Sequence, residues 1–168
     1  MSESSAKLLR QLVSSAGMDE IDQWIAKYPA DEKQSAVMRA LMVVQEEHGY
    51  LTSEQMDAVA EYLDMPAIAV YEVASFYTMY EHKPLGRHLV NVCTNISCKL
   101  CGSAEIVGHL EKKLGIKLGE TTSDGRYTLR SVECLGACAN APMMQVNKDY
   151  HENLTPDDMI DKILEQYQ

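Results

Sequence analysis

The chain has 168 residues, of which 15 are Lys or Arg and 25 are Asp or Glu, and its formal net charge is −10. A surface this acidic repels phosphate backbones and anionic lipids, so we expect no nucleic-acid binding and no membrane-surface role. The sequence has no run of about 18 apolar residues, which argues against direct membrane insertion. It also lacks the pattern of an export signal, so we expect a cytoplasmic protein.

Residues 18–80 carry the apolar periodicity of a small helical domain, after an N-terminus, 1–17, that we expect to be mobile. Thr52, with Gln55 three positions later, has the sequence pattern of a capping box, and Gly49 is a typical helix stop. Helices are predicted over 19–28, 35–49, 51–65 and 66–77. This half contains no cysteine, and we expect a helical bundle that packs against a neighbour.

Residues 81–87 have the Pro and Gly of a linker, and the pattern changes after them. Strands are predicted at 87–93 and 127–134, helices at 99–115 and at 155–168 with Thr155 as its cap, and a short hairpin within 142–155. This order is typical of a thioredoxin-like α/β domain, here over 88–168. The sequence therefore predicts an α+β protein, with an N-terminal helical bundle followed by a thioredoxin-like domain.

All five cysteines lie between positions 93 and 138, and their spacing allows several chemistries. Cys98 and Cys101 form a C-x-x-C, as in a dithiol oxidoreductase, but without the Trp and Gly-Pro of the active thioredoxin pattern. Together with Cys93 they also match the local C-x4-C-x2-C spacing of a plant-type ferredoxin. That spacing needs only one further cysteine, whereas Cys134 and Cys138 form a pair in a loop of their own.

A third arrangement joins two pairs, Cys93 with Cys98 and Cys134 with Cys138, each in a loop after a predicted strand. Two such loops at one edge of a sheet can place four thiolates around a [2Fe–2S] cluster, with two sulfurs for each iron. The same spacing suits a structural zinc site. A Rieske centre is disfavoured because no His lies in a cysteine loop. Spacing alone leaves the dithiol, the plant-type, the two-pair and the zinc arrangements open.

The longer pattern resembles a known family. A C-x4-C, a long gap and a C-x3-C followed by ANAPM are similar to the E subunit of NADH:quinone oxidoreductase, respiratory complex I. The flanking segments ASFYTMYEHKPLGRHLVNVC and GETTSDGRYTLRSVECLGAC resemble the family as well. The similarity covers roughly residues 35–165, and in this family a helical domain precedes a thioredoxin-like domain with one cluster.

The resemblance implies a [2Fe–2S] cluster held by Cys93, Cys98, Cys134 and Cys138, with Cys101 outside the four-cysteine pattern. It implies an electron-transfer subunit of an oxidoreductase, which exchanges electrons with the FMN of a partner subunit that oxidises NADH. Further iron–sulfur subunits of a peripheral arm are also expected as partners, at the cytoplasmic face of the inner membrane.

The chain itself has no G-x-G-x-x-G motif and no P-loop, so we expect NADH and flavin on the partner and no catalytic residue or complete active site here. The alternative function is that of a small diaphorase subunit of an NAD-linked hydrogenase or formate dehydrogenase. Both functions imply the same cluster and a flavoprotein partner.

Overall fold

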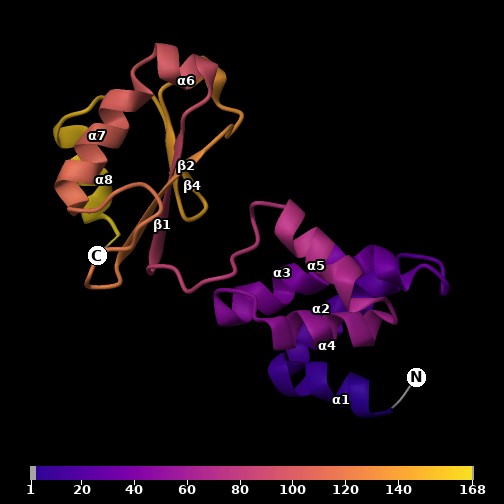
Figure 1. Ribbon diagram of the computed structural model, residues 1–168. Coiled ribbons are helices and arrows are strands. Elements are labelled where there is room, and N and C mark those ends of the chain that lie inside the picture. Colours follow the sequence, from indigo (N-terminus) through magenta and orange to yellow (C-terminus); the bar gives the residue numbers. More distant parts are fainter. Residues whose placement is uncertain (1–2, 168) are drawn as a thin grey trace. The chain divides into compact units, whose positions relative to one another are not determined.

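The computed structural model describes residues 3–167 (Figure 1). The chain forms two compact units that divide between Pro84 and Leu85, inside the segment predicted as a linker. The N-terminal unit is helical, and the C-terminal unit contains a sheet covered by helices. The architecture is therefore α+β, as predicted. Within residues 3–167, no helix is long and apolar enough to cross a bilayer.

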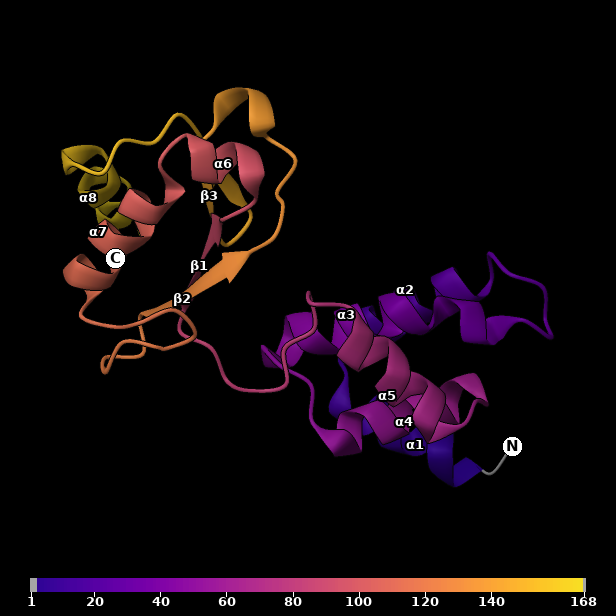
Figure 2. The ribbon, with the colours of Figure 1, turned by 45° about the horizontal axis from the view of Figure 1, so that its top comes forward.

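The helical unit consists of five α-helices and one 3-10 turn among the described residues. They are α1 (Glu3–Leu12), α2 (Ser15–Ile25), η1 (Lys33–Ala36), α3 (Val37–His48), α4 (Ser53–Leu63) and α5 (Ala67–Phe76). Helix α4 packs against α1 on one side and α5 on the other (Figure 2). The apolar faces of the helices meet in one core, whose fully buried members include Leu9, Ile21, Leu41, Val44, Val59 and Leu63.

The start of the chain differs from the expected mobile N-terminus. Residues 3–12 form α1, and Leu9 and Val13 are buried in the helical core. Helix α2 begins at Ser15 rather than at 19, because the Ser14 hydroxyl accepts a hydrogen bond from the Gly17 N–H and caps the helix. The Glu47 carboxylate of α3 in turn accepts a bond from the Ser14 N–H at 2.9 Å, which fixes the α1–α2 junction. Residues 1 and 2 lie outside the described residues.

Two predicted helix boundaries are confirmed in this unit. Gly49 ends α3 with a φ of +83°, a conformation that suits glycine. The Thr52 hydroxyl accepts from the Gln55 N–H while the Gln55 side chain accepts from the Thr52 N–H, which completes the capping box. Pro66, by contrast, lies one residue before α5 rather than at its first position.

The C-terminal unit contains a four-stranded sheet in the order β2-β1-β3-β4. The strands are β1 (His88–Cys93), β2 (Tyr127–Val132), β3 (Met144–Val146) and β4 (Asp149–His151), and the helices are α6 (Ile96–Leu100), α7 (Ser103–Leu114), η2 (Cys138–Asn140) and α8 (Asp158–Glu165). Strands β1 and β2 run parallel, whereas β3 is antiparallel to both β1 and β4. Helices α7 and α8 lie on the same side of the sheet (Figures 1 and 2), and their apolar residues share a core with the strands.

The sheet topology places two loops at one edge. Because β1 and β2 are parallel and paired from His88 with Tyr127 to Cys93 with Val132, both strands end at the same edge of the sheet. The segment after β1 leads into α6, and the segment after β2 leads into η2. The carboxyl edge of the parallel pair therefore carries both cysteine-containing loops, near α6 in Figure 1.

Two helix predictions in this unit are wrong in detail. The helix expected over 99–115 is divided, because Gly102 has a φ of +95° and separates α6 from α7. The last helix begins at Asp158, and its cap is Asp157, whose side chain accepts from the Met159 N–H. Thr155 therefore lies before the helix and does not cap it.

Candidate metal centre

Cys93 and Cys98 are buried together at the end of β1. Cys93 is the last residue of the strand, and Cys98 lies in α6, whose Asn95 side chain accepts from the Ile96 N–H and starts the helix. The exposed fractions are 2% for Cys93 and 1% for Cys98. Both pack with Met143, which is 1% exposed. The two sulfurs are therefore shielded from water by the protein itself.

The environment of Cys98 disfavours a free thiolate. Burial, the neighbouring Cys93 thiol and the charge of Cys138 together raise the pKa of Cys98 to about 11, against a smaller opposing effect of the Met143 backbone. A thiol with such a pKa stays protonated at neutral pH, which makes it a poor nucleophile for disulfide exchange. A bound cation changes this balance, because coordination to a metal deprotonates a thiol. The buried pair is thus suited to hold a metal rather than to act as a free dithiol.

Cys134 and Cys138 lie in the second loop, after β2, and both are exposed. Gly136 between them has a φ of +78°, and its N–H points to the Cys134 Sγ at a distance of 3.4 Å. Cys138 begins the short η2 turn. A backbone N–H that donates to a sulfur stabilises negative charge on it. The turn therefore has the form of a ligand loop rather than of a plain surface connection.

Backbone hydrogen bonds hold the two loops beside each other. The Cys93 N–H donates to the Met143 carbonyl at 3.2 Å, and the Thr94 N–H donates to the Val132 carbonyl at 3.0 Å. The Cys93 Sγ lies 3.9 Å from the carbonyl oxygen of Glu133, the residue before Cys134. These contacts bring both loops to one edge of the sheet.

The structure treats the five cysteines differently. Cys98 lies within interaction range of both Cys93 and Cys138, so three of the sulfurs predicted as ligands are neighbours. Cys134 is in the same loop as Cys138, on the side next to Cys93. Cys101 is at the C-terminal cap of α6 and is exposed. The ligand set proposed from the family pattern is not decided by these positions, but they separate Cys101 from the buried pair.

The chemistry of the donors fits a two-iron cluster better than a single ion. Among residues 3–167, no three side chains of His, Cys, Asp or Glu converge as ligands of one metal ion would. A structural zinc site needs four ligands at about 2.3 Å from one ion. A [2Fe–2S] cluster instead requires two sulfurs at each iron, with the pairs set apart by the bridging sulfides. A set of four thiols in two loops is consistent with that requirement.

Sequence reasoning misses one residue of this site. Met143 is buried against Cys93 and Cys98, and its carbonyl fixes the backbone of Cys93. The sequence pattern places it only in a short hairpin. The signal that could have found it is its position directly after Pro142 in the segment ANAPMM, next to the second cysteine loop.

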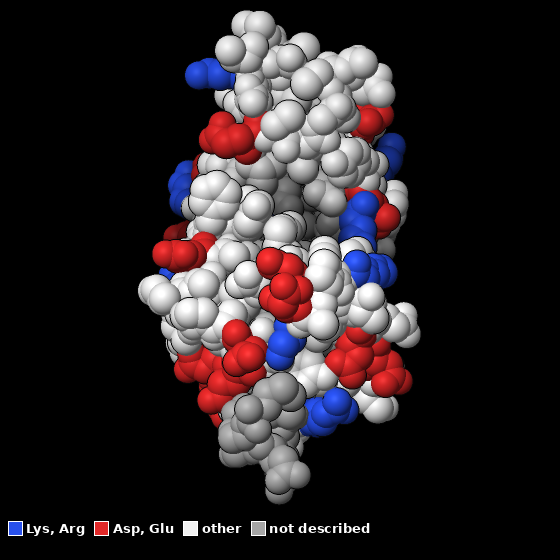
Figure 3. Space-filling model, turned by 90° about the vertical axis from the view of Figure 1, so that its right-hand side faces the viewer, with Lys and Arg blue, Asp and Glu red and all other residues white. Residues whose placement is uncertain are grey.

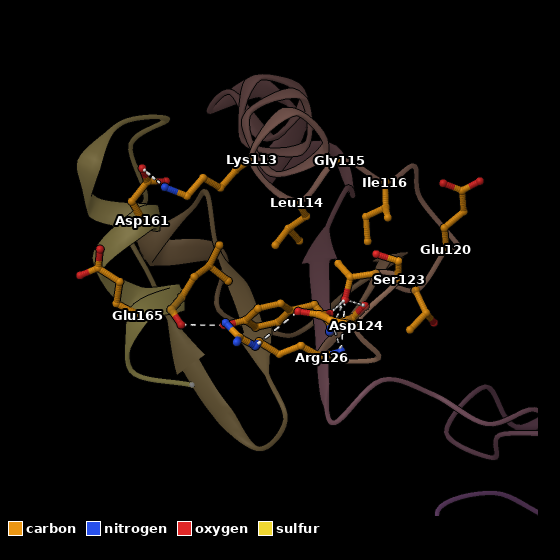
Figure 4. A pocket seen from close by; sticks show the side chains of 14 residues that line it. Lys113, Leu114, Gly115, Ile116, Glu120, Ser123, Asp124, Arg126, Asp161 and Glu165 are labelled. Atoms are coloured by element: carbon orange, nitrogen blue, oxygen red, sulfur yellow. Dashed lines mark hydrogen bonds and ion pairs between the residues drawn. The ribbon is translucent and has the colours of Figure 1, made fainter.

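A cavity of about 850 Å³ lies elsewhere in this unit, between the end of α7, α8 and the loop before β2 (Figure 4). It adjoins Tyr127, at the opposite end of β2 from the cysteine loop. Its two cationic side chains are neutralised, since Lys113 contacts Asp161 at 2.7 Å and Arg126 contacts Asp124 at 3.7 Å. The cavity therefore offers no free charge to an anionic ligand.

Comparison with known proteins gives consistent relatives. Residues 21–168 match the family of thioredoxin-like [2Fe–2S] ferredoxins. One NADH-quinone oxidoreductase E subunit of Rhizobium meliloti (strain 1021), E 2, is 50% identical over 136 residues, which are 81% of this chain and 80% of that protein. The NADH-quinone oxidoreductase E subunit of Rickettsia conorii (strain ATCC VR-613 / Malish 7) is 47% identical over 84% of this chain and 87% of that protein.

A solved structure supports the fold. An NAD⁺-reducing [NiFe]-hydrogenase in its air-oxidised state superposes with a TM-score of 0.64 at 22% identity, over 79% of this chain and 23% of the hydrogenase chain. This chain thus spans less than a quarter of the hydrogenase chain that it matches. The predicted combination of N-terminal helices with a thioredoxin-like domain is confirmed, and so is the expected cofactor type. From its sequence and its fold, the chain belongs to the thioredoxin-like [2Fe–2S] ferredoxin family and to the group of NADH-quinone oxidoreductase E subunits within it.

Proposed function

We propose that this protein is an electron-transfer subunit of an NADH-quinone oxidoreductase, with one [2Fe–2S] cluster that exchanges electrons with a flavin on a partner subunit. The observation that carries the proposal is the pair of cysteine loops at the carboxyl edge of β1 and β2, in a chain 50% identical to an E subunit of such an oxidoreductase. The proposed ligands are Cys93 and Cys98 from the first loop and Cys134 and Cys138 from the second.

The cluster supplies the one-electron chemistry, and the chain supplies its surroundings. Cys93 and Cys98 anchor one side of the site in the core, where Met143 and the strands exclude water. The Gly136 N–H donates toward Cys134 and favours negative charge on that sulfur. Because Cys134 and Cys138 are exposed, electrons would enter and leave on the side of the second loop.

The reaction with NADH belongs to the partner in this proposal. The sequence has neither a dinucleotide-binding nor a P-loop motif, so the flavoprotein partner is assigned both NADH and FMN. Further iron–sulfur subunits of a peripheral arm would complete the electron path. The assembly would lie at the cytoplasmic face of the inner membrane, and this chain would reach the membrane only through its partners.

The test is the visible and EPR spectrum of the purified full-length protein, together with iron and sulfide analysis. We expect about two irons and two sulfides per chain and an EPR signal that appears on reduction. Mixing with the flavoprotein subunit should then allow NADH to reduce the cluster. A colourless protein with one zinc per chain would contradict the proposal.

The hydrogenase similarity supports a second candidate within the same class. A chain of this fold occurs in an NAD⁺-reducing [NiFe]-hydrogenase, so a diaphorase subunit of a soluble NAD-linked enzyme would use the same site. Purification of the intact complex separates the two candidates. Membrane-embedded subunits in that complex support the quinone oxidoreductase, whereas a nickel- or molybdenum-containing subunit supports the diaphorase.

A further inference from the structure

An apolar groove lies on the helical unit between α4 and α5. Its volume is about 340 Å³, and it is lined by Met56, Ile68, Tyr71, Glu72, Ser75 and His82. Tyr71 is held in place because its hydroxyl donates to the Asp57 carboxylate at 2.6 Å. His82 is held by a contact of 3.0 Å between its Nε2 and the Ala74 carbonyl. The groove is thus a formed surface feature, with walls from two helices and the segment after them.

Helix α5 exposes more apolar surface than a solvent-facing helix needs. Its sequence, AIAVYEVASF, is apolar on nearly all sides, although only Val70 and Ala74 are buried in the helical core. Ile68 is 65% exposed, Phe76 is 76% exposed and Met79, just after the helix, is 43% exposed. A cluster of large exposed apolar side chains on one element is typical of a protein–protein contact surface. The apolar character of α5 is therefore unexplained by the packing of the helical unit alone.

The charges around the groove all have one sign. Residues 51–82 contain no Lys and no Arg, and their six carboxylates are Glu54, Asp57, Glu61, Asp64, Glu72 and Glu81. Glu72 is itself part of the groove wall. Figure 3 shows acidic side chains in clusters, with uncharged surface between them, on one face of the helical unit. An apolar groove with an acidic surround is complementary to an apolar segment flanked by cations.

We infer that the α4–α5 groove is a docking site for a segment of a partner polypeptide that presents apolar side chains flanked by Lys or Arg. This inference rests on the proposed function, because it assigns the segment to the flavoprotein subunit. Ile68 and Phe76 supply the apolar contact, and Glu72 supplies the charge that selects a basic segment. Docking through the helical unit would secure the chain to its partner independently of the cysteine loops.

The test compares the affinity of the full-length, cluster-containing chain and its variants for the purified flavoprotein subunit. Ile68→Ser and Glu72→Lys should each weaken binding by about tenfold or more, as truncation of a central interface residue does. Leu118→Ser and Asp19→Lys are the matched controls, since Leu118 is 38% exposed in the C-terminal unit and Asp19 is exposed on α2. Both controls should stay within about twofold of wild type.

A second measurement needs no variant. Met79 on the groove side and Met159 on α8 have similar exposures, 43% and 38%, so peroxide should oxidise both at comparable rates in the free chain. In the complex with the flavoprotein, we expect Met79 to be protected about fivefold or more relative to Met159. Equal oxidation of the two methionines in the complex would overturn the inference, and so would protection of Met79 already present in the free chain.

The outcomes also separate the groove from the proposed function. A chain that carries its cluster and binds the flavoprotein with wild-type affinity despite Ile68→Ser and Glu72→Lys overturns the groove and leaves the function intact. Failure of the wild-type chain to bind any flavoprotein overturns both. A wild-type chain that dimerises and becomes monomeric with Ile68→Ser would show that the groove takes a second copy, which also overturns the inference.

Discussion

Gly136 gives a direct test of how the second loop acts on the cluster. The change Gly136→Ala adds a Cβ at a φ of +78°, and no other atom lies within 4 Å of the position that this Cβ would occupy. The substitution therefore causes no steric clash. Its cost is that of a non-glycine residue in the left-handed region, about 1–2 kcal/mol in the free energy of unfolding. The loop can avoid this cost by rotating the peptide, which turns the Gly136 N–H away from the Cys134 sulfur.

The expected effect on the cluster follows from that hydrogen bond. A donor at a sulfur stabilises the reduced cluster more than the oxidised one, because reduction adds negative charge. If the two redox states differ by about 1 kcal/mol in their interaction with this N–H, its loss lowers the midpoint potential by about 40 mV for one electron. The potential is measured by redox titration of the EPR signal of the full-length protein.

Gly119→Ala is the matched control for backbone strain. Gly119 has a φ of +88°, an added Cβ would also meet no atom within 4 Å, and the residue lies in a turn away from the cysteines. Both variants should lose similar stability in urea unfolding, but only Gly136→Ala should shift the potential. An equal shift in both variants, or an unchanged potential with Gly136→Ala, would refute the role of the N–H.

Three further results are expected. Cys101→Ser should keep the full iron content while Cys98→Ser loses most of it, because Cys98 is 1% exposed beside Cys93 whereas Cys101 is exposed; the reverse iron analysis would restore the plant-type arrangement. Thr52→Ala should lower the stability of the helical unit by about 1 kcal/mol through loss of the capping box, and an unchanged urea midpoint would speak against it. Burial lowers the pKa of His88 and of His151, so the unfolded chain binds these protons more strongly. Stability is then complete above about pH 6.5 and decreases as the pH falls below it, and His151→Gln should flatten that decrease in urea midpoints measured against pH.

The sequence predicted most elements because local signals and tertiary packing agree. The capping box at Thr52 and the stop at Gly49 depend on contacts within a few residues, and both occur in the structure. The start of the chain was predicted less well. Burial of Leu9 and the bond from Ser14 to Glu47 involve residues far apart in sequence, which periodicity in a short window does not detect. Helix α1 is therefore a product of tertiary contacts rather than of its own sequence pattern.

The candidate site shows the same division more sharply. The residue types and the two loops could be predicted, since each follows a recognisable strand. The role of Cys101 could not, because three sulfurs in nine residues fit several spacings equally well. What separates Cys101 in the structure is the end of α6 at Leu100 and the left-handed Gly102, which interrupt the single helix expected there. Cys98 lies inside the short helix and faces Cys93 and Met143, whereas Cys101, one position past the helix end, is exposed to solvent. The position of a backbone break, and not the number of residues between sulfurs, thus assigns Cys98 rather than Cys101 to the buried pair.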